Sequence, residues 1–283
     1  MNQRNGLAWI EEVHNDPVTN ISTAFAIELN VPEIKHFGSI TIDEEHAIRE
    51  SRDWIILEEL GFAIKNIKGI SLTVSAYWTG DNFILRTIFF NDRGLHVGNR
   101  GPQIEANCVT VFKNRGDICI KELKKFGAMI KEKAPEFEGY VNIDVVYAEG
   151  RLWYYGIRIG IYYDFMFAMA VLYNVSPEFL LHRIEEDLEP KNNFAATLRL
   201  YTYYYNDGLL QDILDDCEPS AYLRRFDEGA ILVGWGENIK KAWSTLYNNI
   251  PQSVKDNLDI CYRNDGDRVS RSNFYQLRNE KLI

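Results

Sequence analysis

One stretch of alternating residues constrains the fold more than any other part of this 283-residue chain. Apolar and polar residues alternate over 70–78, as they do in a strand with one face in a core. The polar residues of 79–82 then form a turn signal, and strand-like residues resume over 83–90. We therefore predict an antiparallel hairpin, to which the rest of the chain must add neighbouring strands and covering helices.

Other segments extend this pattern. A tight turn at Ala148–Gly150 joins two strand-like segments, and three amphipathic or apolar segments have helical spacing. The expected strands are Trp54–Leu60, Gly139–Tyr147 and Leu152–Tyr163, and the expected helices are Thr41–Ser51, Asp117–Ala134 and Phe165–Leu172. Hairpins mixed with helices predict an α+β protein: a mostly antiparallel sheet with helices on one face, plus a small C-terminal α/β module.

The predicted domain organisation has three parts. Residues 1–38 are weakly patterned, residues 39–188 form the main domain, and residues 189–283 form the C-terminal module. Ser176–Glu189 is expected to be an acidic helix before the boundary, because Ser-Pro-Glu is a good helix start. Polar turns at Arg263–Arg268 are expected to end the folded part.

Composition excludes several classes of function. A formal net charge of -10 argues against a broad nucleic-acid surface, because binding phosphates requires clustered Lys and Arg. The four cysteines form no CxxC pair, so neither a zinc site nor a disulfide framework is indicated. No secretory signal or membrane span is recognisable, which predicts a soluble, cytoplasmic protein. The aromatic run Trp153–Phe167 indicates core packing.

The stretch Gly94–Val111 carries the most suggestive polar residues. Its Gly-Asn-Arg-Gly-Pro sequence combines flexible glycines with the hydrogen-bond donors of Asn99 and Arg100, which suits anion binding. An ordinary hairpin connection has the same composition, and local composition alone favours it.

The order of these features resembles the phosphoribosylamine–glycine ligase family, which belongs to the ATP-grasp superfamily. The resemblance covers about residues 40 to 268. It is carried by the strand WIILEEL at 54–60, the turn TGDNF at 79–83, Arg-Gly-Pro at 100–102, GIRIG at 156–160, and C-terminal segments at 229–236, 238–247 and 262–266.

The resemblance implies roles for particular residues. It places nucleotide contacts at Glu58, Glu59 and Leu60. It also implies ATP with Mg²⁺ as cofactors. Contacts to substrate or phosphate are implied for five residues: Asn99, Arg100, Gly101, Pro102 and Arg158.

The chain departs from the family at the metal site. Alignment on Arg158 places Tyr154 and Gly156 where the family has its Glu and Asn metal ligands, so no metal ligand is predicted there. Asp144 and Asp164 are the nearby acids that could replace them. Ser71 stands where the family has an acid, and the family's glycine-rich nucleotide loop has no counterpart in the first 40 or so residues.

Two functions remain open. The first is a diverged protein, a pseudoenzyme, that binds or acts on a nucleotide or ribose phosphate with its ligase chemistry impaired or repurposed. The second is an active ATP-dependent carboxylate–amine ligase of purine metabolism. That ligase would act alone, as a homo-oligomer, or with a second chain that supplies the missing half.

Overall fold

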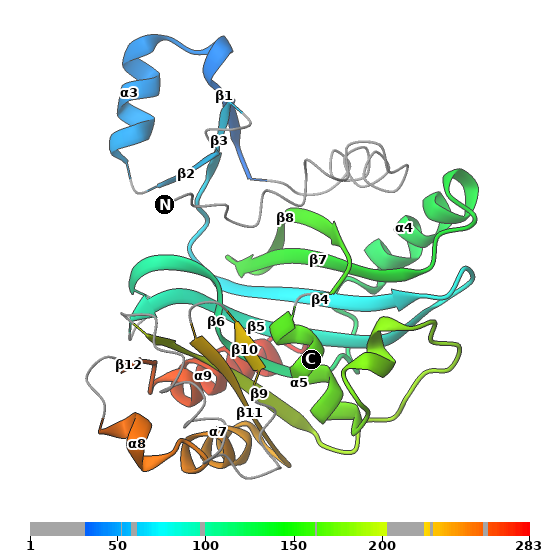
Figure 1. The fold of residues 1–283 in the computed structure, drawn as a ribbon. Helices are drawn as coiled ribbons and strands as arrows, with labels where there is room; N and C mark the ends of the chain where they lie inside the picture. Colours follow the sequence, from blue (N-terminus) through cyan, green and yellow to red (C-terminus); the bar gives the residue numbers. More distant parts are fainter. Residues whose placement is uncertain are drawn as a thin grey trace.

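The computed structural model describes residues 32–51, 53–57, 61–96, 100–161, 163–202, 224–226, 229–256 and 260–283. These residues form a small lobe and a large sheet with its covering helices (Figure 1). None of the described helices is long and apolar enough to span a bilayer.

The small lobe is an antiparallel three-stranded sheet with one helix. Its strand order is β1 (Ile34–His36), β3 (Phe62–Lys65) and β2 (Trp54–Leu57), with the 3-10 turn η1 at Phe37–Ser39 and helix α3 at Ile42–Glu50. A capping box begins α3. The Thr41 hydroxyl accepts from the Glu44 amide, and the Glu44 carboxylate accepts from the Thr41 amide. The predicted helix is confirmed, since Thr41 and the acidic first turn satisfy its free N–H groups.

The large sheet is antiparallel throughout its described strand pairs. The order is β10-β11-β9-β6-β5-β4-β7-β8, and β12 also pairs with β9. The strands are β4 (Ile70–Trp78), β5 (Phe83–His96), β6 (Arg100–Lys113), β7 (Gly139–Ala148), β8 (Arg151–Ile159), β9 (Phe194–Thr202), β10 (Arg224–Phe226), β11 (Gly229–Gly236) and β12 (Ile260–Cys261). The predicted β4–β5 hairpin lies near its centre, and β9 joins strands from both sides of residue 188 into one sheet.

Helices cover both faces of this sheet, whereas the sequence placed them on one. They are α4 (Ile120–Lys133), α5 (Tyr163–Tyr173), α7 (Ile239–Asn248), α8 (Gln252–Lys255) and α9 (Gly266–Asn279). Helix α5 packs on the face that carries Phe89 and Val109, and α7 packs on the face that carries Leu198 and Leu232. The α+β class and the antiparallel sheet are confirmed. Apolar residues at both alternating sets of strand positions require cover on both sides.

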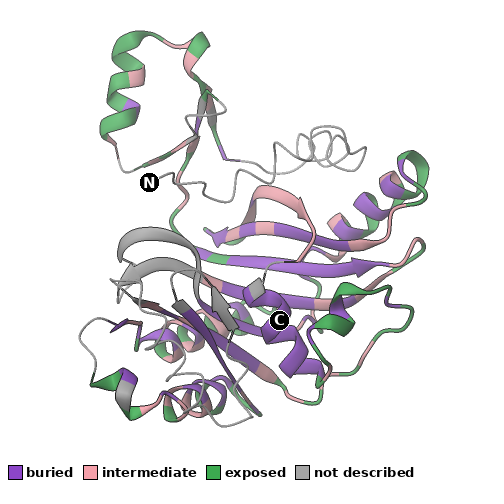
Figure 2. Ribbon diagram, viewed as in Figure 1, coloured by how far each residue is buried: buried purple, intermediate pink, exposed green. Residues whose placement is uncertain are grey.

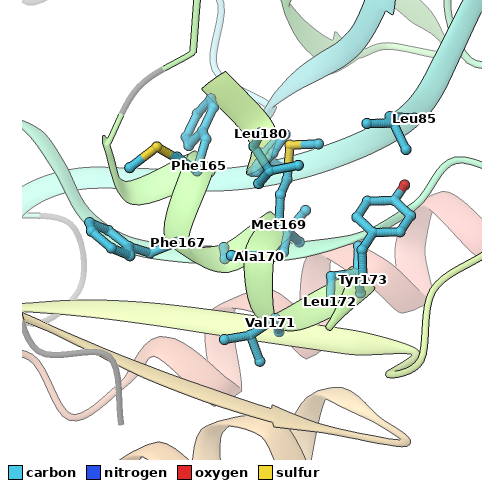
Figure 3. Close-up of a cluster of buried hydrophobic side chains, with 14 of the residues drawn as sticks. Leu85, Phe165, Phe167, Met169, Ala170, Val171, Leu172, Tyr173 and Leu180 are labelled. Carbon is cyan, nitrogen blue, oxygen red and sulfur yellow. The ribbon is translucent and has the colours of Figure 1, made fainter. Parts of the chain in front are cut away.

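One of the buried apolar clusters of the core is built around α5. Figure 3 shows its side chains spreading in several directions, and every described side chain from Asp164 to Tyr173 is buried. Phe165 stacks on Phe89 of β5 with ring centroids 3.9 Å apart and an angle of 11°. Figure 2 shows the contrast with α3, which is mostly exposed. A helix that is apolar all round is stable only when covered all round, which explains why segment 174–190 folds over α5.

Two predicted elements are corrected. Ser176–Glu189 is not a helix: only the 3-10 turn η3 (Glu178–Leu181) forms. The chain is then held against the sheet, because the Asp187 carboxylate accepts from the Leu85 amide at 2.8 Å and pairs with Lys113 at 3.2 Å. The polar turn at Arg263–Arg268 does not end the folded part, since α9 follows it and packs Phe274 against Phe112.

Candidate functional site

Three polar side chains meet on the α5 face of the sheet, one from each of three neighbouring strands. Arg158 of β8 holds Asp144 of β7 with two parallel hydrogen bonds, from Nε to Oδ2 at 2.5 Å and from Nη2 to Oδ1 at 2.6 Å. The Thr73 hydroxyl of β4 donates to Asp144 Oδ1 at 2.6 Å. We call these three residues the Asp144 cluster. They share a face because Thr73 is opposite Asp144 in the ladder and alternates with the core residues Leu72 and Val74.

The Asp144 cluster is partly shielded from water. Side-chain exposure is 26% for Arg158 and 20% for Asp144. The flat guanidinium matches the carboxylate in a two-bond fork, which is the strongest arrangement available to this pair. The carboxylate of Asp144 is therefore already satisfied by a cation and a hydroxyl from its own chain.

Further polar groups lie on the next row of the same face. Asn142 donates from Nδ2 to the Gly160 carbonyl at 2.6 Å, which fixes the end of β8. Within the described residues, Asn142 Oδ1, Ser75 Oγ and Thr87 Oγ1 are buried without a hydrogen-bond partner. Buried polar atoms of this kind normally have a partner, so this row has capacity to bind water or a polar ligand group.

A bulge in β8 separates Tyr154 and Gly156, which the resemblance aligns with metal ligands. Gly156 pairs with Asp144 and Tyr154 pairs with the next residue, Val145, so Tyr155 is an extra residue between them. Gly156 consequently lies beside the Asp144 cluster, whereas Tyr154 points to the opposite face. There it is buried beside Cys119, and burial raises its pKa.

The predicted ligand-binding residues are only partly described. Glu58, Glu59, Leu60 and Asn99 lie outside the described residues. Arg100, Gly101 and Pro102 belong to β6, and Arg100 pairs with His96 of β5, so Gly94–Val111 contributes a β-hairpin whose strand begins inside the expected polar turn. Nothing is described of their side chains. Arg158 is the one predicted ligand residue whose side chain is described, and it lies in the Asp144 cluster.

Comparison with known proteins rests on structure. No protein-family model matches the sequence, and no curated protein matches it. Solved structures do. A phosphoribosylamine–glycine ligase from Thermotoga maritima aligns with a TM-score of 0.62 and 13% identity over 90% of this chain and 84% of that one. The chain has an ATP-grasp fold.

Other ATP-grasp enzymes align with similar scores. N5-carboxyaminoimidazole synthase from Aspergillus clavatus, in complex with ADP and 5-aminoimidazole ribonucleotide, has a TM-score of 0.56 and 11% identity over 85% of this chain and 78% of that one. An L-amino acid ligase from Bacillus licheniformis has a TM-score of 0.52 and 12% identity over 82% of this chain and 68% of that one. These likenesses support the ATP-grasp part of the expected resemblance and leave the narrower family unassigned.

An ATP-grasp fold implies Mg²⁺ with ATP, and the described residues do not fit that ion. Mg²⁺ needs several hard oxygen ligands in a near-octahedral array. Gly156 has no side chain, Tyr154 points away, and Asp144 is held by Arg158. The other replacement acid, Asp164 of α5, is 2% exposed and is held in a fork by Arg199. Among the described residues, no group of three His, Cys, Asp or Glu side chains could hold a metal.

Tyr155, the bulge residue, connects the large sheet to the small lobe. Its hydroxyl donates to the Lys65 carbonyl at 3.0 Å and accepts from the Ile67 amide at 2.7 Å. Lys65 is the last residue of β3, and Ile67 lies in the link between β3 and β4, where the chain leaves the small lobe. The aromatic run around Tyr155 indicates core packing, and no pattern in the sequence identifies this contact.

Proposed function

We propose that this protein binds a nucleotide or ribose phosphate on the α5 face of its ATP-grasp fold, with the ligase chemistry of that fold impaired or repurposed. The observation that carries the proposal is the fork of Arg158 on Asp144. A carboxylate already neutralised by its own chain is a poor ligand for a divalent cation.

The electrostatic consequence is specific. In phosphoryl transfer, metal ions neutralise the charge that develops on the transferring group, and the protein contributes little covalent chemistry. The guanidinium of Arg158 holds Asp144 in place of an exchangeable ion, and the pair carries no net charge. The Asp144 cluster therefore lacks the metal-supplied charge for transferring a phosphoryl group, and the phosphate contacts of this proposal are those implied for Asn99 to Pro102.

The class of ligand is supported by the neighbours and by the sequence. The Aspergillus clavatus enzyme was solved with ADP and a ribonucleotide. The resemblance places nucleotide contacts at Glu58, Glu59 and Leu60, and phosphate contacts at Asn99 to Pro102. The proposal includes a soluble, cytoplasmic protein. Its expected organisation is a grasp domain over 39–188 and a C-terminal module over 189–283.

Calorimetric titration with ADP and with ribose 5-phosphate, with and without Mg²⁺, tests the proposal. We expect binding of at least one ligand with an affinity that Mg²⁺ does not change. The Arg100→Met variant should weaken phosphate binding about tenfold, as expected for the loss of a charge-assisted hydrogen bond. The matched control is Arg115→Met, which removes an exposed arginine elsewhere. No binding of either ligand would contradict the proposal.

The second candidate function is an active ATP-dependent carboxylate–amine ligase. It is favoured by one observation: solved structures with this fold include a phosphoribosylamine–glycine ligase and an L-amino acid ligase. It predicts Mg²⁺-dependent ADP release when ATP, a carboxylate and an amine are all present. That result would replace the first proposal, and co-purification of a second chain with the activity would identify the completed ligase.

A further inference from the structure

A groove lies on the face of the sheet opposite the Asp144 cluster. It runs between the turn of the β4–β5 hairpin and helix α4, and its volume is about 320 Å³. Helix α4 packs on this face through Leu123, which shares a core with Leu72 and Val74, whereas Thr73 points to the other face. The sheet therefore separates the groove from the site discussed above.

The floor of the groove is aromatic, and its exposed aromatic surface belongs mainly to Phe83, because Trp78 is almost fully buried. Trp78 and Phe83 from the two ends of the hairpin turn have ring centroids 4.8 Å apart at an angle of 52°. Trp78 is only 4% exposed. Gly127 lets α4 lie directly on this floor, because a Cβ at that position would come within 2.6 Å of Trp78 Cζ3. A flat apolar group of a ligand can pack against this aromatic surface.

The rim of the groove is positively charged. Arg86 comes from β5, Lys124 and Lys131 come from α4, and Asp81 is the acid among the lining residues. Asp81 is paired with Lys131 at 2.6 Å. In the part of the chain that the structure describes, neither Arg86 nor Lys124 has a carboxylate partner. On a chain with a net charge of -10, two such cations beside an apolar floor are a local reversal of sign.

We propose that this groove binds a small anion with a flat apolar body, of the aromatic carboxylate class. The aromatic floor contacts the ring, and Arg86 and Lys124 hold the carboxylate. The volume lies at the lower end of the range for small-molecule sites, which suits a ligand of one or two rings. The α4 residues that line the groove are three or four positions apart in the sequence. They therefore lie on one face of the helix, and this face forms the α4 wall of the groove.

Titration with 1-anilinonaphthalene-8-sulfonate, followed by its fluorescence, tests the proposal. The probe combines aromatic rings with one negative charge. We expect saturable binding that benzoate displaces. Arg86→Ala and Lys124→Ala should each weaken probe binding about tenfold, as expected for loss of a charge-assisted hydrogen bond. Ala128→Trp should abolish it, because the new ring fills the groove from the exposed side of α4.

The matched control is Lys125→Ala, which removes an exposed α4 lysine outside the groove and should leave the affinity unchanged. Circular dichroism of each variant separates lost binding from lost folding. Equal affinity in the wild type, Lys124→Ala and Ala128→Trp would overturn the proposal. Competition by ADP would overturn it too, since it would place the nucleotide in this groove. If ADP binds without displacing the probe, the nucleotide site of the proposed function and the groove are separate sites.

Discussion

At the scale of single residues, Arg158 determines what the Asp144 cluster can do. Its guanidinium occupies both carboxylate oxygens, and Thr73 adds a third hydrogen bond. Partial burial strengthens these contacts and makes an unpaired Asp144 unfavourable. Arg158, for which the resemblance implies a ligand contact, is therefore also the counter-ion of Asp144 in the fold.

Replacing Arg158 should destabilise the protein measurably. We expect Arg158→Met to lower the free energy of unfolding by about 1–3 kcal/mol, because it leaves the Asp144 carboxylate partly buried without its cation. The value is below that of a fully buried pair, since water reaches about a quarter of the arginine side chain. Urea denaturation measures the change. Arg115→Met, at an exposed position, should change stability by less than about 0.5 kcal/mol. Equal effects of the two substitutions would contradict this interpretation.

At the scale of secondary-structure elements, local capping and close packing fix the helices. Helix α3 has little buried surface of its own, so its capping box matters more than it would in a core helix. Helix α4 depends instead on contact with the hairpin, where Gly127 meets Trp78. Substitution should therefore weaken α3 through its cap and α4 through its packing.

Helix α3 should lose stability in acid. Hydrogen bonds from the Thr41 amide and hydroxyl lower the pKa of Glu44 below its ordinary value of 4.5. A carboxylate whose pKa is lowered by folding stabilises the folded state above its unfolded pKa, and this contribution is lost as the pH falls through the lowered value. Amide hydrogen exchange of α3 should therefore accelerate below about pH 4.5 relative to α7, whose cap is the neutral Asn238.

Thr41→Ala should weaken α3 by about 1 kcal/mol at neutral pH, as is usual for loss of an N-cap. The acid-dependent acceleration should become smaller but not vanish in this variant, because the backbone amide of residue 41, the larger cause of the lowered pKa of Glu44, remains and only the hydroxyl contribution is lost. An unchanged acid response would show that other groups control it.

Gly127→Ala should destabilise the protein although alanine favours helices. The propensity gain in an open helix is about 1 kcal/mol. Here the added methyl group would lie 2.6 Å from the buried Trp78 ring, and overpacking of this kind costs about 1–3 kcal/mol. Thermal denaturation should show a lower midpoint for the variant. A higher midpoint would mean that α4 moves away from the hairpin without loss.

At the scale of the whole molecule, the fold joins a small lobe to one continuous antiparallel sheet. The link between them passes beside β8, where Tyr155 binds its backbone. The bulge that creates this contact also turns Tyr154 away from the Asp144 cluster. One inserted residue therefore affects both the lobe connection and the ligand set of the site.

Tyr155→Phe should loosen the connection between the lobes. The substitution leaves the Ile67 amide without its partner and removes the bond to the Lys65 carbonyl. We expect exchange of the Ile67 amide to accelerate about tenfold, because loss of a hydrogen bond of about 1–2 kcal/mol changes the opening equilibrium by that order. Exchange in α7, far along the sheet, should be unchanged. Uniform acceleration in both regions would indicate global destabilisation instead.

Local patterns in the sequence determined most of the elements. Alternation predicted β4 and β5, Thr41 predicted where α3 begins, and the Ala148–Gly150 turn predicted the β7–β8 hairpin. These features depend on residues a few positions apart, so they can be recognised without the fold. The order of motifs also led to the ATP-grasp fold, although sequence identity to solved structures with this fold is near 10%.

The tertiary structure decided what those local patterns could not. Ser176–Glu189 has a good helix start, yet Asp187 bonds to Leu85, a hundred positions away. The register of β8 against β7 placed Gly156 and Tyr154 on opposite faces, and it brought Arg158 to Asp144. Pairing between distant strands depends on packing across the whole sheet. The sequence by itself therefore determined the elements and the kind of fold, and the sheet register decided which side chains meet in the site.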